Sequence, residues 1–307
     1  MAEAERVVCC IPTCGRPERL LSNLQRVGQV LPAGSLIVVG DNLCDARLRR
    51  TLSSLELVHS RVNYLEVSER NISANRNACA AAALALAPNA DWVAFLDDDI
   101  EVPLNWWNCL IDVARATDAD VVGAPSVPIG CNRSLWLEVG LAEFRRGGKS
   151  GPVDVLSSGG NFIVKSEWLR RLGDELFRLD LGLTGGEDAE LFLRLKAAGA
   201  TFAWCAEAES IEHIEKDRST AVAVAWRAFT TGCACATFQG NGVNILSRFI
   251  SVASALVRAV GAIILAILWR DWKRCVRSVL GAAYSLGQIL ALFGVKFERY
   301  ATPRKPA

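Results

Sequence analysis

Short apolar runs recur at regular intervals along the first part of this chain. Each run is rich in β-branched side chains, and successive runs start about 25 to 30 residues apart, with helical patterns between them. The clearest helical pattern is the Ala- and Leu-rich segment 73–87, which Pro88 ends. Strands that alternate with helices predict an α/β fold with a doubly wound, mostly parallel sheet. The expected strands are 6–11, 35–40, 62–67, 91–96 and 120–123.

The turn after the first expected strand restricts the kind of nucleotide site. Residues 12–17 read Pro-Thr-Cys-Gly-Arg-Pro and lack the G-x-G-x-x-G pattern that seats a dinucleotide on a helix N-terminus. The sequence therefore does not support an NAD-dependent oxidoreductase, although such enzymes use a similar sheet.

Three consecutive aspartates, Asp97, Asp98 and Asp99, follow the apolar run 92–96. Ligands bind at the carboxyl ends of the strands in an α/β sheet, so this strand brings dense negative charge to that edge. Neighbouring carboxylates repel one another unless a cation joins them, and hard ions such as Mg²⁺ or Mn²⁺ prefer oxygen ligands. A metal ion that also binds a diphosphate fits best. The alternative is a solvated turn in which Asp99 caps the helix expected near Pro103.

The segment 124–156 interrupts the regular pattern with several glycines and three prolines. We expect irregular structure there, and such segments often shape binding pockets, in this case an acceptor pocket. Regular structure is expected to resume with a strand over 157–164, which contains Gly159 and Gly160, and with a helix from residue 166.

A second acidic signal, Glu187-Asp188, opens a helix whose apolar residues recur at helical spacing. This places Asp188 on the first helical turn. A carboxylate there can act chemically, or it can simply complement the helix dipole, which is worth about 0.3 to 1 kcal/mol.

Charge is distributed unevenly along the 307 residues. The net charge is +1, but residues 243–307 contain 10 Lys and Arg against 2 Asp and Glu, so this tail alone is +8. The first 242 residues carry no basic patch interleaved with aromatic side chains, so nucleic acid is not an expected partner. These differences predict one domain at 1–242 and a separate C-terminal region at 243–307.

The tail contains two apolar stretches, 249–269 and 276–295, each long enough to cross a membrane. Polar residues gather on one face of each stretch, so both are expected to be amphipathic helices rather than uniformly apolar ones. These polar residues are Ser251, Ser254 and Arg258 in the first stretch and Ser278, Ser285 and Gln288 in the second.

The linker between the two stretches is basic, with Arg270, Lys273 and Arg274. Two membrane crossings would place this linker outside the cytosol, against the positive-inside bias. We therefore expect an interfacial helical hairpin on the membrane, with Trp269 and Trp272 at headgroup depth. The alternative is a soluble helical extension that packs on the first domain.

The 11 cysteines lie mostly in apolar runs, and the charged N-terminus does not resemble a secretory signal peptide. We therefore expect reduced thiols in a cytoplasmic protein. Cys233 and Cys235 form a C-x-C pair, but no second cysteine pair at metal spacing accompanies it, so a structural zinc site is not expected.

Six short motifs resemble, in the same order, those of the family 2 glycosyltransferases of the GT-A fold. The resemblance covers about residues 6–235 and is strongest to the bacterial exopolysaccharide enzymes of the succinoglycan type. Gly40 and Asn75 depart from the family's pattern, in which these positions are often acidic or serine and small, respectively. The motifs are 10–13 with Arg16 and Pro17, 38–42, 71–77, 95–99, 159–162 and 186–191.

The resemblance implies a nucleotide-binding half at 1–123 and an acceptor-binding half at 124–242. Asp41 would accept a hydrogen bond from the base, with uracil expected because its imide N–H needs a buried acceptor. Arg76 would hold the nucleotide or its phosphates, unless it is a solvated helix residue. The nucleotide-site residues implied in this way are Pro12, Thr13, Arg16, Asp41, Asn42, Arg76, Asp97 and Asp98.

The aspartate triplet is similar to the family's D-x-D element. The resemblance implies that Asp99 coordinates the Mg²⁺ or Mn²⁺ ion on the diphosphate, that Asp97 contacts the ribose or the metal, and that Asp98 supports them. Some GT-A enzymes use a histidine at the position of His213 as a further metal ligand; the alternative is a histidine satisfied by neighbouring acids. Arg218 would close over the diphosphate, or else be solvated.

The resemblance further implies an inverting transfer. Asp188, the aspartate of the family's Glu-Asp pair, would remove the proton from the acceptor hydroxyl, and Glu187 would orient acceptor hydroxyls. Gly159, Gly160 and Asn161 would border the acceptor.

The expected function is transfer of a sugar from a nucleotide-diphosphate sugar, a UDP-sugar, to a saccharide or lipid-linked acceptor in bacterial polysaccharide biosynthesis. The reaction would take place on the inner face of the cell membrane, with the enzyme peripherally associated. The alternative is a non-catalytic nucleotide-sugar-binding or scaffold protein of a polysaccharide assembly complex.

Overall fold

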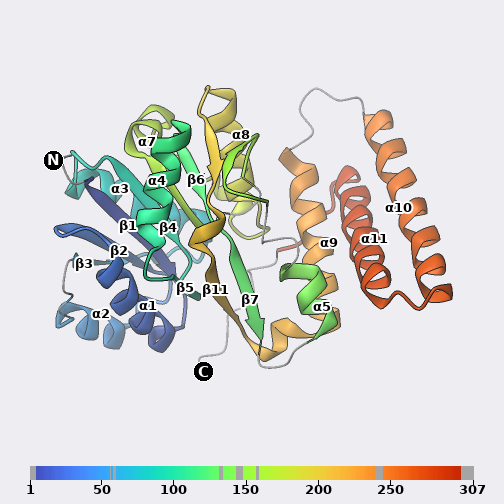
Figure 1. Cartoon of the computed structure of the whole chain (residues 1–307), viewed down its shortest axis with the longest axis horizontal. Coiled ribbons are helices and arrows are strands. Elements are labelled where there is room, and N and C mark those ends of the chain that lie inside the picture. Colours follow the sequence, from blue (N-terminus) through green and yellow to red (C-terminus); the bar gives the residue numbers. More distant parts are fainter. Residues whose placement is uncertain are drawn as a thin grey trace.

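The computed structural model describes residues 5–55, 57, 60–130, 134–142, 148–156, 159–238 and 245–298. Within these ranges, eight strands form one large sheet in the order β3-β2-β1-β4-β9-β6-β10-β8. Figure 1 shows this sheet with helices packed around it and further helices to one side. The strands are β1 (Val7–Thr13), β2 (Ser35–Asp41), β3 (Ser60–Glu66), β4 (Trp92–Leu96), β6 (Val121–Gly123), β8 (Gly151–Val153), β9 (Asn161–Lys165) and β10 (Phe202–Trp204).

The sheet is mostly parallel, as predicted. Strands β1 to β4 pair in parallel, and so do β6 and β10. Two strands are exceptions: β9 runs antiparallel to both of its neighbours, β4 and β6, and the edge strand β8 runs antiparallel to β10. The first residues of β9 therefore lie beside the last residues of β4, where the aspartate triplet begins.

Helices cover both faces of the sheet, which makes it doubly wound. In β1 the side chains of Val7, Cys9 and Ile11 join the core under α1, α2 and α4, whereas Val8 and Cys10 join the core under α3, α7 and α8. This alternation is the two-residue period of a strand that is buried on both faces. The helices are α1 (Pro17–Val30), α2 (Ala46–Ser53), α3 (Ile72–Leu86), α4 (Trp106–Thr117), α7 (Ser166–Leu172) and α8 (Glu187–Ala197).

The segment that we expected to be irregular contains regular structure. Strand β7 (Ser126–Gly130) pairs with β11 (Ser210–Ile214), which also pairs with β5 (Ile100–Glu101) in a second sheet. Strands β7 and β8 each contain a proline, and both are edge strands, where the missing N–H is tolerated. A short helix α5 (Leu135–Leu137) and a π-helix η1 (Glu138–Ala142) follow. The prediction of irregular structure was therefore wrong for these parts.

The C-terminal region is helical, as predicted. Helix α9 (Ala221–Phe238) is followed by α10 (Ile245–Leu268) and α11 (Trp272–Leu292), and α10 lies farthest from the sheet (Figure 1). Asp271 caps α11 by accepting a hydrogen bond from the Arg274 N–H at 3.0 Å, so α11 starts four residues before the apolar stretch that we expected.

Helices α9 and α11 approach each other closely through glycines. A Cβ atom added to Gly287 would lie 2.0 Å from the Phe229 carbonyl oxygen, and one added to Gly232 would lie 2.0 Å from that of Tyr284. Ser285, which we placed on the polar face of the second apolar stretch, is buried. At this residue the polar face lies beside the contact between α11 and α9. Because α9 lies before residue 242, the expected domain boundary cuts a packed helical unit.

Candidate active site

The candidate site lies where four chain segments meet at one edge of the large sheet. Leu96 of β4 pairs with Asn161 of β9, and the Asp97 N–H donates a hydrogen bond to the Gly160 carbonyl at 2.9 Å. The end of β4 is thus joined to the start of β9. The end of β1 and the first turn of α8 complete the site.

Gly159 and Gly160 lie against two of the predicted aspartates. The Gly159 N–H donates to Asp188 Oδ2 at 2.7 Å. A Cβ atom at Gly159 would lie 2.3 Å from the Cβ of Asp188, and one at Gly160 would lie 2.6 Å from Oδ2 of Asp97. Real Cβ atoms do not approach other atoms this closely. The dipeptide must therefore lack side chains if one aspartate is to lie against each glycine.

Arg76 of α3 links the end of β4 to the first turn of α8. Its guanidinium donates to Glu187 Oε1 at 2.7 Å and to Asp97 Oδ1 at 2.8 Å, and it lies 5.5 Å from the ring centre of Phe177. Its side chain is only 5% exposed, so it is not the solvated helix residue that we considered. Its guanidinium binds two carboxylates. This favours a role for Arg76 in positioning Glu187 and Asp97, and not the expected direct contact with the nucleotide.

Glu187 has an unusual environment for a carboxyl group. Burial raises its pKa to about 7, against the opposing effect of the Arg76 guanidinium. Its Oε2 atom is buried without a hydrogen-bond partner in the described part of the chain. Asp188, on the same turn, accepts from the backbone N–H of Ala189 at 2.8 Å in addition to the bond from Gly159.

Asp98 points into the protein. Its carboxylate accepts from the Thr13 hydroxyl and from Arg16, each at 2.7 Å. Burial raises the pKa of Asp98 to about 7, although Arg16 acts in the opposite direction. Asp98 is thus a buried anchor that joins the end of β4 to the end of β1 and to Arg16. Asn23 of α1, which sequence reasoning missed, holds the same residue by donating to its carbonyl oxygen at 2.9 Å.

Arg16 and Arg218 supply the positive charge beside Asp99. Arg16 lies 2.5 Å from Asp99 Oδ2 and 3.5 Å from Glu215, and Arg218 lies 3.5 Å from the same Asp99 oxygen. Arg218 belongs to the 3-10 helix η4 (Lys216–Ser219), directly before α9. Pro12, which precedes Thr13 in β1, is buried.

Asp41 and Asn42, which were predicted to lie in the nucleotide site, hydrogen-bond to other groups of the protein. Asp41 accepts from the Leu43 and Asp45 N–H groups, each at 2.8 Å, and from the Tyr64 hydroxyl at 2.9 Å. Asn42 donates to the Glu69 carbonyl at 2.7 Å. Both residues are buried. This geometry indicates that Asp41 shapes the loop after β2. It does not favour a direct contact between Asp41 and the base.

Gly40 and Asn75, the two residues that depart from the family's pattern, lie against each other. The Asn75 amide donates to the Gly40 carbonyl at 2.9 Å, and a Cβ atom at Gly40 would lie 1.9 Å from Asn75 Oδ1. The larger side chain at residue 75 therefore requires the glycine at residue 40. Cys79 lies against the same position, 2.6 Å from the added Cβ atom.

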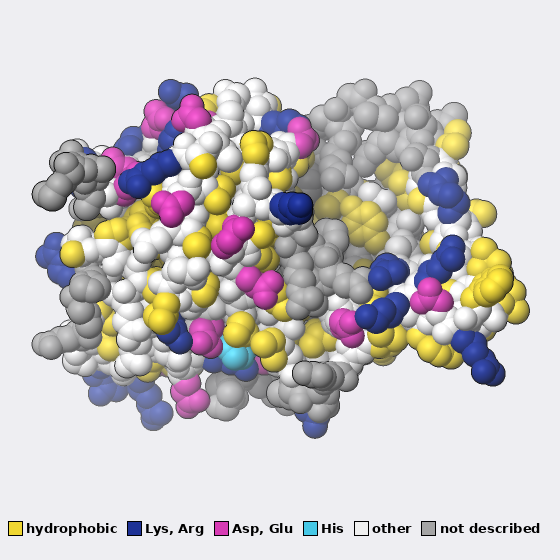
Figure 2. Space-filling model, in the orientation of Figure 1, with side chains coloured by type: hydrophobic (Ala, Val, Ile, Leu, Met, Phe, Trp, Pro, Cys, Tyr) yellow, Lys and Arg dark blue, Asp and Glu magenta, His cyan; other side chains and the backbone are white. Residues whose placement is uncertain are grey.

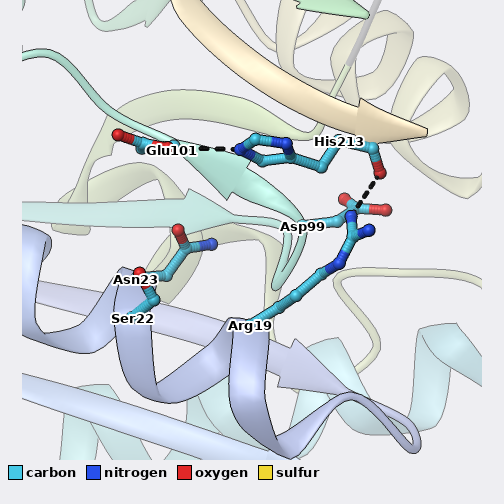
Figure 3. A pocket seen from close by; sticks show the side chains of 6 residues that line it. All are labelled: Arg19, Ser22, Asn23, Asp99, Glu101 and His213. Carbon is cyan, nitrogen blue, oxygen red and sulfur yellow. Dashed lines mark hydrogen bonds and ion pairs between the residues drawn. The ribbon is translucent and has the colours of Figure 1, made fainter. Parts of the chain in front are cut away.

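His213 lines a small pocket next to the site, together with Asp99 and Glu101 (Figure 3). Its Nε2 atom lies 3.2 Å from Glu101 Oε2, and its carbonyl accepts from Arg19 at 2.7 Å. The described residues contain no group of three His, Cys, Asp or Glu side chains placed to hold a metal ion. The expected ligand set of Asp97, Asp99 and His213 is thus not assembled, because the imidazole is directed at Glu101.

Two carboxylates nevertheless fit a divalent ion that is shared with a diphosphate. The Asp97 side chain is 38% exposed, and Arg76 binds only its Oδ1 atom. Asp99 contributes a second carboxylate whose partners are arginines. Mg²⁺ and related hard ions commonly bind through one or two carboxylates plus substrate phosphate oxygens, so this donor set suits them.

Asn161 does not border open space. The Trp106 indole donates to its Oδ1 at 2.8 Å, and its amide donates to Ser210 at 3.0 Å. The side chain is buried and ties β9 to α4 and β11. Of the three residues expected near the acceptor, the two glycines therefore lie at the site, and Asn161 lies behind them.

The chain resembles known proteins in both sequence and fold. Residues 8–173 match the protein family described as "Glycosyl transferase family 2". The chain is 27% identical over 276 residues to the succinoglycan biosynthesis protein ExoM of Rhizobium meliloti (strain 1021), which covers 86% of this chain and 85% of that protein.

Solved structures share the fold. The mannosyltransferase PcManGT from Pyrobaculum calidifontis, in complex with GDP-Man and Mn²⁺, superposes with a TM-score of 0.58 at 18% identity, over 93% of this chain and 88% of that one. GalNAc-T7 with UDP, GalNAc and Mn²⁺ gives a TM-score of 0.54 at 12% identity, over 76% of this chain but only 48% of that one. The large, mostly parallel sheet is therefore that of the GT-A glycosyltransferases, and the chain belongs to glycosyl transferase family 2.

Proposed function

We propose that this glycosyltransferase moves a sugar from a UDP-sugar to a hydroxyl group of a saccharide or lipid-linked acceptor, with inversion at the anomeric carbon. One observation carries the proposal. Asp97 and Asp188, from segments far apart in the sequence, lie against the adjacent glycines Gly160 and Gly159. In the proposal, Asp97 serves the donor and Asp188 serves the acceptor, and their contacts with one dipeptide support a shared site.

The reaction needs a base for the acceptor hydroxyl. In the proposal, Asp188 takes this proton while the hydroxyl oxygen attacks the anomeric carbon from the face opposite the nucleoside diphosphate. The bond to the diphosphate breaks as the new glycosidic bond forms, so the configuration inverts. Asp188 suits this role because the Gly159 N–H and the helix turn fix its orientation before the acceptor binds.

Asp97 and Asp99 would hold a Mg²⁺ or Mn²⁺ ion, which neutralises the negative charge that develops on the departing diphosphate. Arg16 and Arg218 lie next to Asp99 and would add positive charge at the same place. Two relatives of similar fold were crystallised with Mn²⁺, which supports a divalent ion for this chain.

The choice of UDP is the finer part of the proposal, because the structures of similar fold contain UDP in one case and GDP-Man in the other. The loop after β2, which Asp41 holds in place through Leu43 and Asp45, would form the base pocket. Thr13, beside Asp98, would line the same pocket.

The acceptor would belong to a bacterial polysaccharide. The similarity to a succinoglycan biosynthesis protein over 86% of the chain supports this assignment. We place the reaction at the cytoplasmic face of the cell membrane, with the enzyme peripherally associated.

Release of UDP or GDP from a panel of nucleotide sugars, with and without Mn²⁺ and with saccharide acceptors, tests the proposal. We expect Asp188→Asn to reduce transfer by about 10² to 10⁴-fold with little change in donor affinity. Asp99→Asn should instead weaken donor binding in the presence of Mn²⁺.

Asp180→Asn is a matched control, because Asp180 is an exposed aspartate that pairs with Arg178. It should transfer at the parental rate. Transfer by Asp188→Asn at the parental rate would exclude Asp188 as the base. Donor binding without any turnover by the parental protein would favour the alternative of a nucleotide-sugar-binding scaffold.

A further inference from the structure

Helix α10 presents an apolar face that is exposed among the residues that the structure describes. Its exposed apolar residues recur at intervals of three, four and seven positions, so they lie along one side of the helix. The opposite side packs on α11 and includes Ala266, which is 1% exposed. The exposed large apolar residues of α10 are Phe249, Ile250, Val257, Val260, Ile264, Leu265, Ile267 and Leu268.

The turn between α10 and α11 continues this face with its largest side chains. Leu268 is 72% exposed, Trp269 is 80% exposed and Trp272 is 59% exposed. A soluble monomer rarely exposes two tryptophans and a leucine together, and such clusters mark binding surfaces. We call the exposed residues of α10 and this turn the α10 face.

Basic side chains surround the α10 face. Arg258, Arg270 and Arg274 are exposed, and so are Lys273 and Arg277 of α11. Figure 2 shows hydrophobic side chains at the end of the molecule away from the large sheet, with Lys and Arg beside them. The only acidic residue of the turn is Asp271, which caps α11. The surface is therefore both apolar and strongly positive.

This combination points to one kind of partner. We infer that the α10 face binds the surface of an anionic lipid bilayer, with Trp269 and Trp272 at headgroup depth. A second copy of this chain is a poor partner, because a symmetric contact would bring the same arginines together. Anionic headgroups instead pair with the arginines, while the apolar side chains enter the acyl boundary.

The packing of α11 separates this surface from a membrane span. By length and composition, α11 is the one helix in the described ranges that could cross a membrane, and 17% of its apolar window is buried. Its small-residue side is occupied by α9, through Gly287 and through the Cys233 Sγ–H, which donates to the Gly287 carbonyl at 3.0 Å. Lys273, at its start, also lies 2.6 Å from Glu138 of η1. A crossing would break these contacts, whereas binding through α10 leaves them intact.

The inference thus refines the expected hairpin. Both helices of the tail were expected to lie in the interface, but most of the exposed large apolar side chains of the described tail lie on α10 and the turn, and α11 contributes Leu286 and, at its end, Phe293. Helix α11 instead joins α10 to α9 and so to the segment that contains Arg218. The active site and the α10 face are thereby parts of one packed body. The inference does not depend on the proposed reaction, because binding to lipid is measured without turnover.

Co-sedimentation of the full-length protein with vesicles tests the inference. We expect binding to vesicles of phosphatidylcholine with phosphatidylglycerol, and much weaker binding to phosphatidylcholine alone. The double variant Arg270→Ala/Arg274→Ala should weaken binding about 25-fold, since each basic residue at the surface contributes about 1 kcal/mol, or about fivefold. The double variant Trp269→Ser/Trp272→Ser should weaken it at least tenfold at any salt concentration.

Two control variants keep the test specific. Leu104→Ser removes a leucine that is 67% exposed far from the α10 face, and Arg50→Ala removes an exposed arginine of α2. Both should bind vesicles like the parental protein. Thermal stabilisation by UDP-sugars should be the same for all four variants, which confirms that each is folded.

Two results would overturn the inference. In one, the parental protein does not bind anionic vesicles. In the other, the parental protein forms a dimer that the tryptophan variant dissociates, which would make the α10 face an interface between two copies of this chain.

Discussion

Replacing Gly159 by alanine should slow sugar transfer without weakening donor binding. The added Cβ atom would lie 2.3 Å from the Cβ of Asp188 and 2.7 Å from its Oδ2 atom. Ordinary contact begins at 3.4 Å, so the first turn of α8 must move by about 1 Å. The 2.7 Å hydrogen bond from the Gly159 N–H to Asp188 would lengthen or break at the same time.

The size of the effect follows from this displacement. A misplacement of about 1 Å in a catalytic group can cost about 10²-fold in rate. Overpacking costs about 1 to 3 kcal/mol in the free energy of unfolding, which a domain of this size tolerates. Asp97 lies against Gly160, not Gly159, so the donor side of the site keeps its geometry. We therefore expect kcat to fall about 10²-fold while the KM for the UDP-sugar stays nearly constant.

Steady-state kinetics of purified Gly159→Ala, with urea unfolding as a check on the fold, would measure this effect. Gly281→Ala on α11 is the matched control, because no atom of the described residues lies within 4 Å of its added Cβ atom. It should retain the parental rate and gain up to about 1 kcal/mol in stability, as alanine is the better helix former. A folded Gly159→Ala enzyme with the parental kcat would refute the argument that this contact positions Asp188.

Three further outcomes follow from the buried groups. Arg76→Met should lower the free energy of unfolding by about 3 to 5 kcal/mol, measured with urea, because it leaves Glu187 and Asp97 without their shared cation. Glu187 has a folded-state pKa of about 7, above its usual value of 4.5. The folded protein therefore binds extra protons between these two pH values, and its stability falls as the pH rises through about 7. Glu187→Gln should flatten this pH dependence of stability, measured by thermal melts. Gly287→Ala should cost about 1 to 3 kcal/mol, because its Cβ atom would lie 2.0 Å from the Phe229 carbonyl; its urea midpoint, compared with that of Gly281→Ala, tests the α9–α11 contact.

The sequence predicted the strands well wherever an apolar run is bounded by clear helices. Strands β1, β2, β3 and β4 start or end within two residues of the expected runs. The strand expected over 157–164 corresponds to β9, Asn161–Lys165, and residues 157 and 158 lie outside the described ranges. The direction of β9 was not predictable, because an apolar run reads the same whether its strand is parallel or antiparallel to its neighbours.

The candidate site was predictable in its composition but not in its contacts. The aspartate triplet, the glycine pair and Asp188 could be found as motifs and do meet in the fold. The Arg76–Glu187 pair could not, since 111 residues separate its members and neither has a sequence signal for the other. The inward orientation of Asp98 and the loop contacts of Asp41 depend on tertiary packing, which short motifs do not encode.

The excursion between β6 and β9 has a consequence for how this enzyme can be altered. Gly123 of β6 pairs directly with Phe162 of β9, and the Ala124 N–H donates to the Asn161 carbonyl at 3.1 Å. The two ends of the excursion are therefore held together by the sheet, while β8, within the excursion, pairs with β10 at the edge of the same sheet. Doubling the length of a closed loop costs only about 0.6 kcal/mol in entropy. Insertions between β7 and β8 should thus be tolerated as long as these two strands keep their partners, β11 and β10, and the aspartates at the end of β4 should then remain in place.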